Sequence, residues 1–215
     1  MPGSGYFQNL RSEVADFLPA HYSKVLEIGC GDGNFHANLK QRCEYWGIEP
    51  DKDAAEIALQ KLNKVLLGTY EAVDERLPDH YFDLVICNDV IEHMIDHEAF
   101  FKKIRNKIKE NSYIVGSVPN VRYIGNLYEL LIKKNWQYQA QGILDRTHLR
   151  FFTEKSFKRT ITENNFIVEE FHGIVGAEFK SSFMVNFSRR LLSYFVGKDT
   201  QFLQFGFRVK CTNQD

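Results

Sequence analysis

Lys24-Val25-Leu26-Glu27-Ile28-Gly29-Cys30-Gly31-Asp32-Gly33 decides the fold, because a short apolar segment runs directly into a glycine-rich turn. Twenty residues beyond Gly29, a second apolar segment ends on Glu49. Glycines let the backbone approach a ligand closely, and a carboxylate at the end of the next strand accepts hydrogen bonds from ribose hydroxyls. The stretch therefore predicts a nucleoside pocket built on an α/β sheet.

The spacing of the glycines separates two classes of nucleoside cofactor. Dinucleotide-binding enzymes carry Gly-x-Gly-x-x-Gly, but their last glycine position is Asn34 in this chain. The chain has Glu-x-Gly-x-Gly-x-Gly instead, and with Glu49 this resembles the first two cofactor motifs of class I S-adenosylmethionine-dependent methyltransferases. The simpler alternatives are a tight turn without a ligand and, for Glu49, an exposed strand end.

Composition limits the size and the partners of the protein. The 215 residues fit one domain, so we expect a single methyltransferase domain over 1–215. The 27 basic and 28 acidic residues nearly cancel, and we expect no nucleic-acid partner. No signal-peptide pattern and no apolar run of about 20 residues is present. We therefore expect a cytoplasmic monomer or homodimer without a membrane span, although peripheral membrane contact stays open.

Helix and strand patterns alternate along the chain, which predicts a mostly parallel sheet covered by helices. The resemblance implies the Rossmann-like class I methyltransferase fold, an α/β fold with seven strands, helices on both faces and an insertion after strand five. The expected strands are 24–30, 45–49, 65–68, 82–87, 113–118, 166–171 and 202–211. The expected helices are 1–20, 34–42, 51–62, 96–109 and 153–164, with Asp51 and Thr153 as caps.

Ligands of open α/β sheets bind beyond the carboxyl ends of the strands, where the strand order reverses. The resemblance implies S-adenosyl-L-methionine as the cofactor and S-adenosyl-L-homocysteine as the product. The residues expected to bind it follow strands one to four: Glu27, Gly29, Cys30, Gly31, Gly33, Glu49, Pro50, Tyr70, Glu71, Asn88 and Asp89. Tyr70 and Glu71 depart from the family's common Gly-Asp-Ala pattern, so a surface position is the alternative for Glu71.

The segment 82–94 resembles the family's fourth-strand motif and ends on Glu92 and His93. Adjacent residues point to different faces of a helix, which argues against a shared metal ion. His93 and His97 are four residues apart, but no glutamate directly follows His93 as the metalloprotease pattern requires. The four cysteines also lack metal-ligand spacing, so we expect no metal.

Gly142-Ile143-Leu144-Asp145-Arg146-Thr147-His148-Leu149-Arg150-Phe151-Phe152-Thr153 is the second informative stretch. With Val118-Pro119-Asn120-Val121-Arg122, it resembles small methyltransferases of bacterial polysaccharide and O-antigen gene clusters. This resemblance covers about residues 20–175 and implies a role in polysaccharide biosynthesis with a small-molecule or glycan acceptor. The residues expected to bind the acceptor are Asn120, Arg122, Asp145, Arg146 and Arg150. A salt-bridged loop that anchors the insertion is the structural alternative.

The resemblance implies O-methylation of a sugar or a related polar metabolite by in-line methyl transfer. A hydroxyl acceptor must lose its proton, and histidine has a suitable pKa near neutral pH. His148 is the first expected general base and His93 the second. The alternatives are a quinone or other aromatic acceptor, a nicotinamide-dependent oxidoreductase, and a non-catalytic protein that binds the cofactor.

The last third of the chain carries an apolar stripe at helical spacing. Its residues are Phe179, Phe183, Phe187, Leu191 and Phe195. A helix packed on the core is the simplest interpretation; a lid over the acceptor, a dimer surface and contact with a membrane-held substrate are the others. We expect the additions 120–150 and 175–200 to form the acceptor site or its lid.

Overall fold

The two central strands, β1 (Lys24–Ile28) and β4 (Phe82–Asn88), are buried along most of their length. Continuous burial is typical of parallel strands that are covered on both faces of a sheet. β1 pairs in parallel with β2 (Glu44–Glu49) on one side and with β4 on the other. The strand order therefore reverses between β1 and β4.

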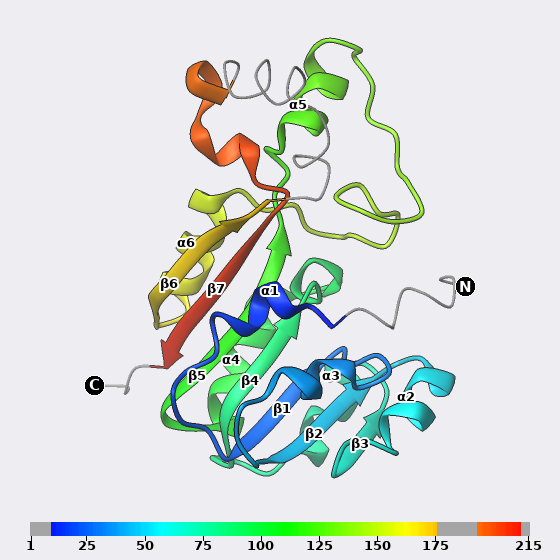
Figure 1. The fold of residues 1–215 in the computed structure, drawn as a ribbon, viewed down its shortest axis with the longest axis vertical. Coiled ribbons are helices and arrows are strands. Elements are labelled where there is room, and N and C mark those ends of the chain that lie inside the picture. Colours follow the sequence, from blue (N-terminus) through cyan, green and yellow to red (C-terminus); the bar gives the residue numbers. More distant parts are fainter. Residues whose placement is uncertain (1–9, 176–192, 212–215) are drawn as a thin grey trace.

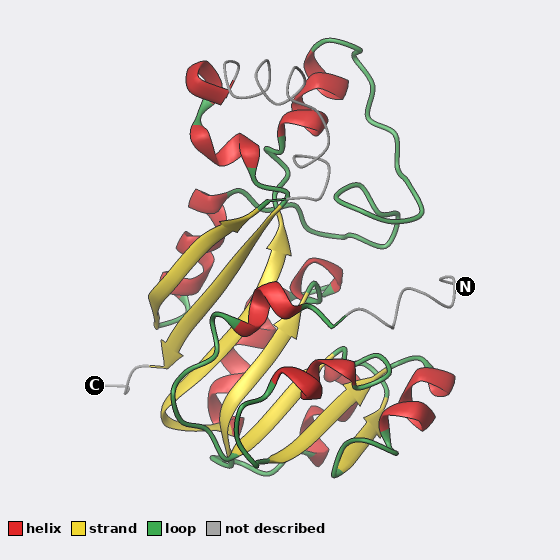
Figure 2. Ribbon diagram, in the orientation of Figure 1, coloured by secondary structure: helices red, strands yellow, loops and turns green. Residues whose placement is uncertain are grey.

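The computed structural model describes residues 10–175 and 193–211, and within them the sheet has seven strands in the order β3-β2-β1-β4-β5-β7-β6 (Figures 1 and 2). β1 to β5 run parallel, whereas β7 is antiparallel to both β5 and β6. The other strands are β3 (Lys64–Leu67), β5 (Ile108–Pro119), β6 (Phe166–Ile174) and β7 (Gln204–Cys211). This topology confirms the predicted α/β, mostly parallel fold.

Helices cover both faces of the sheet (Figure 1). The α-helices include α1 (Ser12–Ala15), α2 (Lys52–Ala58), α3 (Tyr70–Val73), α4 (His97–Lys107), α5 (Ile124–Leu131) and α6 (Glu154–Glu163). Short 3-10 helices are η2 (Asn34–Asn38), η3 (Asp74–Arg76), η4 (Ile91–His93) and η6 (Lys198–Gln201). α1 and α2 pack on one face, whereas α3, α4 and α6 pack on the other.

Alternate residues of each central strand enter two separate apolar cores. In β1, Leu26 and Ile28 join the core under α4 and α6, whereas Val25 joins the core under α1. In β4, Val85 and Leu84 divide between the two cores in the same way. Both faces of the sheet are thus fixed by the same strands, which holds the carboxyl ends of β1 and β4 rigidly in place.

The predicted helix caps at Asp51 and Thr153 are confirmed. Asp51 Oδ1 accepts a hydrogen bond of 3.0 Å from the backbone N–H of Ala54. Thr153 Oγ1 accepts a hydrogen bond of 3.1 Å from the Ser156 N–H, and Ser156 Oγ accepts one of 2.9 Å from the Thr153 N–H. These two reciprocal bonds form a capping box at the start of α6.

Two predicted helices are wrong in type or extent. The segment 34–42 forms only the 3-10 helix η2, which ends because Leu39 has an extended backbone, with φ of −74° and ψ of 133°. Of the predicted helix 1–20, the described part contains only the single turn α1. Arg11, with φ of 51°, has a left-handed backbone that prevents the helix from starting earlier.

The predicted boundaries around strand five are also corrected. Ile108, expected at the end of the preceding helix, pairs with Phe82 and begins β5. Two apolar side chains within the predicted helices are not buried: Ile57 of α2 is 42% exposed, and Leu10 is 50% exposed. The apolar pattern thus identified the elements but not every buried position at their ends.

The predicted insertion lies between β5 and α6 and carries α5 beyond the carboxyl end of β5 (Figure 1). Of the predicted stripe, Phe179, Phe183, Phe187 and Leu191 lie outside the described residues. Phe195 is described and is 78% exposed. Among the described helices, none combines the length and the apolar character needed to cross a bilayer.

The capping box gives a stability prediction. Thr153→Ala removes the hydrogen bond from the Ser156 N–H to Thr153 Oγ1, so we expect the free energy of unfolding to fall by about 1 kcal/mol. Urea unfolding followed by circular dichroism measures this difference. Thr162→Ala in the same helix is the matched control, because Thr162 Oγ1 bonds only to carbonyls within the helix. Equal losses in both variants would contradict the capping role.

Candidate active site

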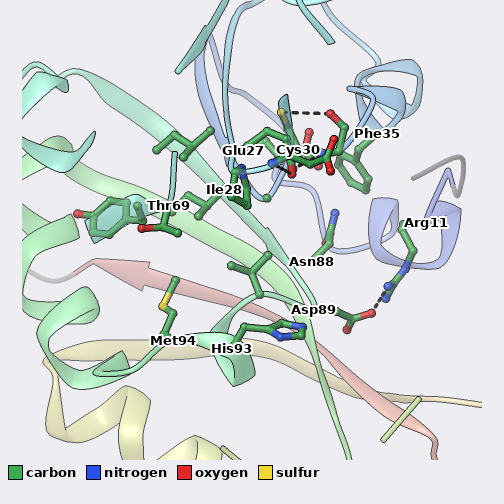
Figure 3. Close-up of a pocket in the computed structure, with 18 of the residues that line it drawn as sticks. Arg11, Glu27, Ile28, Cys30, Phe35, Thr69, Asn88, Asp89, His93 and Met94 are labelled. Carbon is green, nitrogen blue, oxygen red and sulfur yellow. Dashed lines mark hydrogen bonds and ion pairs between the residues drawn. The ribbon is translucent and has the colours of Figure 1, made fainter. Parts of the chain in front are cut away.

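A cavity of about 800 Å³ opens at the carboxyl ends of β1, β2 and β4 (Figure 3). Its volume is in the range of small-molecule and cofactor sites. It is lined by all but one of the residues predicted to bind the cofactor: Glu27, Gly29, Cys30, Gly31, Glu49, Pro50, Tyr70, Glu71, Asn88 and Asp89. The exception is Gly33. The topology therefore brings the four separate sequence signals into one site.

The glycine turn between β1 and η2 needs glycine for two different reasons. Gly29 has φ of 70°, and a Cβ atom there would lie 2.6 Å from Val90 Cγ2. Gly33 also has a positive φ, and a Cβ atom there would lie 3.3 Å from the Ala58 backbone. Gly29 thus lets the turn pass close to the loop after β4, whereas Gly33 permits packing on α2 and does not line the cavity.

The Glu49 carboxylate is held across the glycine turn by two backbone donors. The Gly31 N–H donates to Oε2 over 2.7 Å, and the Asp51 N–H donates to Oε1 over 2.9 Å. Burial raises the pKa of Glu49, and these two hydrogen bonds oppose that rise. Each oxygen keeps a lone pair, so the carboxylate is oriented to accept hydroxyl donors from a ligand in the cavity.

Glu27 lies deeper, where its side chain reaches the neighbouring strand. The Tyr45 hydroxyl donates to Glu27 Oε2 over 2.8 Å. Burial raises the pKa of Glu27 to about 8. At neutral pH this carboxyl is therefore mostly protonated, and it adds little negative charge to the floor of the cavity.

Asp89 is bound to the protein's own residues. It has φ of 52°, and its carboxylate pairs with Arg11 and accepts hydrogen bonds of 2.8 Å from both Ser117 Oγ and Gln204 Nε2. Arg11 and Gln204 also line the cavity, but neither was predicted from the sequence. No local pattern marks them, because they come from the segment before β1 and from the start of β7.

Two buried polar atoms at the cavity are unpaired within the described part of the chain. They are Asn88 Oδ1 and the Tyr70 hydroxyl, neither of which has a hydrogen-bond partner. Both residues line the cavity, and Figure 3 shows the Asn88 side chain extending toward it. Buried polar groups are nearly always paired, so these two atoms need a partner that the described residues do not supply.

The two predicted bases lie together, but only His93 lines the cavity. The rings of His93 and His148 are 4.7 Å apart and perpendicular. The His148 side chain is only 7% exposed. Burial, followed by the neighbouring His148, lowers the pKa of His93. The structure thus gives His93, the second choice from sequence, direct access to a ligand.

The residues predicted to bind the acceptor do not line the cavity. Arg122 pairs with Asp199, and Asn120 is fully buried with its amide bonded to the carbonyls of Asp199 and Phe202. The remaining three residues are in the 145–150 segment: Asp145 bonded to Thr147, Arg150 bonded to the Ile95 carbonyl, and Arg146 exposed. Their assignment to an acceptor stays a prediction, and Gln141 and Gly142 are the insertion residues that line the cavity.

Comparisons with known proteins agree with this geometry. A family model described as a methyltransferase domain matches residues 4–170. A ubiquinone biosynthesis O-methyltransferase of Bradyrhizobium diazoefficiens is 24% identical over 172 residues, which cover 73% of this chain and 63% of that protein. The corresponding protein of Rickettsia prowazekii is 27% identical over 159 residues, covering 71% and 62%. The match thus spans less than two thirds of either relative.

Solved structures share the fold. A SAM-dependent methyltransferase from Archaeoglobus fulgidus has a TM-score of 0.64 at 22% identity, covering 94% of this chain and 90% of that one. A SAM-dependent methyltransferase from Aquifex aeolicus has a TM-score of 0.60 at 11% identity, covering 99% and 94%. At these identities the likeness concerns the fold alone.

The residues of the cavity fit S-adenosylmethionine. The crowded glycine turn allows close backbone approach, the oriented Glu49 carboxylate suits ribose hydroxyls, and Asn88 Oδ1 offers an unused acceptor. Arg11 lines the same cavity, where its guanidinium pairs with Asp89 and Glu13.

Glu49 gives a binding prediction. Glu49→Gln replaces a charged acceptor by a neutral one with a single acceptor oxygen, so we expect S-adenosylmethionine to bind at least about tenfold more weakly. Isothermal titration calorimetry measures the dissociation constant. Glu56→Gln, an exposed carboxylate on α2, is the matched control. Unchanged affinity in Glu49→Gln would remove Glu49 from the cofactor site.

Proposed function

Because the chain belongs to the methyltransferase domain family, we propose that it transfers the methyl group of S-adenosylmethionine to a hydroxyl oxygen of a polar small molecule, with His93 as the general base. The observation that carries this proposal is the shared cavity. It holds the cofactor residues and one accessible histidine, His93, whose pKa is lowered. Figure 3 shows His93 beside Asp89 and Met94, across the cavity from Glu27 and Cys30.

The acceptor proposed first is a sugar or a related polar metabolite, free or as part of a glycan. Asp89 and Gln204 bond to each other beside His93, and Gln141 lines the same cavity. These carboxyl and amide groups suit a ligand with several hydroxyls. An acceptor of this kind agrees with the resemblance to polysaccharide-cluster enzymes.

Bound S-adenosylmethionine supplies a methyl group that is already activated for transfer. The protein's task is to align the acceptor oxygen, exclude water and remove one proton. Alignment of bound reactants contributes about 7–11 kcal/mol to lowering a barrier of this kind. The Glu49 carboxylate and the glycine turn fix the ribose end, so that the reacting end is directed toward His93.

His93 is suited to accept the acceptor's proton. Its Nδ1 lies 3.1 Å from the Thr147 carbonyl oxygen. A carbonyl only accepts hydrogen bonds, so Nδ1 carries the proton and Nε2 has a free lone pair. Burial and the nearby His148 lower the pKa of His93, which keeps the imidazole neutral at physiological pH.

A lipid-soluble phenol or quinone precursor is the second candidate acceptor. The relatives named ubiquinone biosynthesis O-methyltransferase support it. The region of α5 adds a surface that suits a membrane-held substrate, since Leu131 and Ile132 are 64% and 66% exposed and precede Lys133 and Lys134. Apolar side chains next to lysines are typical of segments that touch anionic bilayers.

The base assignment predicts a selective loss of turnover. His93→Ala should lower kcat by about 10²–10⁴-fold because the acceptor proton loses its receiver, while the dissociation constant of S-adenosylmethionine stays within twofold. Release of S-adenosylhomocysteine with nucleotide-sugar and catechol acceptors measures the rate and separates the two acceptor classes. His21→Ala, at an exposed position, is the control. Parallel loss of affinity and rate would make His93 structural.

The lowered pKa of His93 predicts the acidic limb of the pH profile. A base acts in its neutral form, so kcat/KM falls as the pH drops through the pKa of His93. Because this pKa lies below the ordinary value of 6.5, the rate at pH 6.5 should exceed half of its plateau. A profile from pH 5 to pH 9 measures this. A midpoint above pH 6.5 would contradict the assignment.

A further inference from the structure

Glu92, in η4, is a buried carboxyl group that the proposed methyl transfer does not use directly. Its side chain is fully buried, and neither carboxyl oxygen has a hydrogen-bond partner within the described residues. Its backbone carbonyl, by contrast, accepts hydrogen bonds of 2.8 Å and 3.0 Å from the N–H groups of Leu149 and Arg150. The main chain is thus firmly tied to the insertion while the side chain faces a site without donors.

The side chains next to Glu92 are those of His93 and His148, and the Nε2 atom of each imidazole carries no proton. His148 Nε2 lies 3.9 Å from Glu92 Oε1. His148 Nδ1 lies 2.9 Å from the Ile143 carbonyl oxygen and so carries the proton, which leaves a lone pair on Nε2. His93 is in the same tautomer by the same argument. One oxygen or nitrogen atom from each of the three residues lies within 4.8 Å of the others.

The surrounding charges make a bare carboxylate unfavourable at this place. Asp89 from the end of β4 and Asp145 from the insertion both face Glu92 and oppose a further negative charge, while Arg11 from the N-terminal segment partly offsets them. Asp145 is occupied by the N–H and hydroxyl of Thr147, and Asp89 by Arg11. Burial, followed by Asp89, raises the pKa of Glu92 well above its ordinary value, so the Glu92 carboxyl group holds a proton.

We propose that Glu92 shares this proton with His148, and that Glu92 is the positioning residue that fixes the histidine pair. Glu92 Oε1 and His148 Nε2 are 3.9 Å apart, so the proton bridges them when the two side chains approach by about 1 Å. Both His148 nitrogens are then hydrogen-bonded, and its ring is fixed against His93. A second proton in the cluster is repelled, so His93 stays neutral. The proposal rests on the proposed function for its catalytic meaning, but the proton itself is measurable without turnover.

The chemical step leaves the shared proton in place. As the acceptor oxygen forms its bond to the methyl carbon and the sulfur–methyl bond breaks, the acceptor O–H bond breaks and its proton binds His93 Nε2. That proton then passes to solvent from the cavity, and His93 returns to its neutral form. Loss of the shared proton at high pH loosens the His148 ring and gives the reaction an alkaline limit.

Glu92→Gln tests the proposal, because the Gln amide donates to His148 Nε2 permanently and cannot titrate. We expect the imidazole NMR signals of His148 in the wild-type protein to move when Glu92 loses its proton, well above the ordinary glutamate pKa. This movement should be absent in Glu92→Gln and present in the control Glu98→Gln. Signals are assigned with His148→Gln and His93→Gln. Identical His148 titration curves in the wild type and Glu92→Gln would overturn the proposal.

A second measurement keeps the test valid if Glu92→Gln fails to fold. In wild-type protein with ¹³C-labelled glutamate, one side-chain carboxyl signal should titrate at the same midpoint as His148. Titration midpoints near the ordinary glutamate pKa for all of the glutamate carboxyl signals would overturn the proposal. So would a shift of both imidazole signals on dialysis against EDTA, because a metal ion rather than a proton would then fill the site.

Activity gives an independent readout of the positioning role. Glu92→Gln should retain the rate at pH 7 within about twofold and lose the alkaline limb of the kcat profile. Glu92→Ala, which leaves His148 Nε2 unpaired, should lower kcat by about tenfold at unchanged cofactor affinity. Equal rates and profiles in both variants would overturn the positioning role. An inactive wild type with the NMR step intact would contradict the proposed function alone.

Discussion

The reversal of strand order between β1 and β4 is the constraint on which the rest of this structure depends. After β1 the chain moves outward through β2 and β3, and it returns to the other side of β1 as β4. The loops after these two strands therefore diverge and leave a crevice at the carboxyl edge. Gly29 and Val90 come from these two loops, and a Cβ atom on Gly29 would collide with Val90. The two loops therefore pack closely against each other at this point.

One residue from before the first strand and one from the last described strand close one side of this crevice. Arg11 comes from the segment before the sheet, and Gln204 begins the last strand, yet both contact Asp89 after β4. The antiparallel pairing of β7 with β5 brings Gln204 to this position, opposite Pro119. The Arg11 guanidinium, the Ser117 hydroxyl and the Gln204 amide thus fix the carboxylate of Asp89, whose backbone is left-handed. The cost of that backbone conformation is offset by these contacts.

The sequence predicts the parts of the site that depend on local geometry. The glycine turn, the acid at the end of β2 and the cap at Asp51 follow from backbone conformation and hydrogen-bond chemistry within a few residues, and all three are present. Arg11 and Gln204 escape prediction because they act through contacts that span the whole sheet. The insertion residues escape for a related reason: polar composition does not tell whether a side chain such as Arg122 faces a ligand or its own loop.

The ranking of His148 before His93 as the expected base shows the same limit of prediction from sequence. His148 stands in the more polar stretch, so composition favours it as the base, but its Nδ1 bonds to the Ile143 carbonyl and its side chain is only 7% exposed. His93 follows a buried strand, and its position in η4 puts it at the cavity. Backbone bonds tie the insertion to Glu92, and His148 of the insertion packs against the ring of His93. Under the proposed function, a substitution in this anchor therefore changes the surroundings of His93 without contacting a ligand.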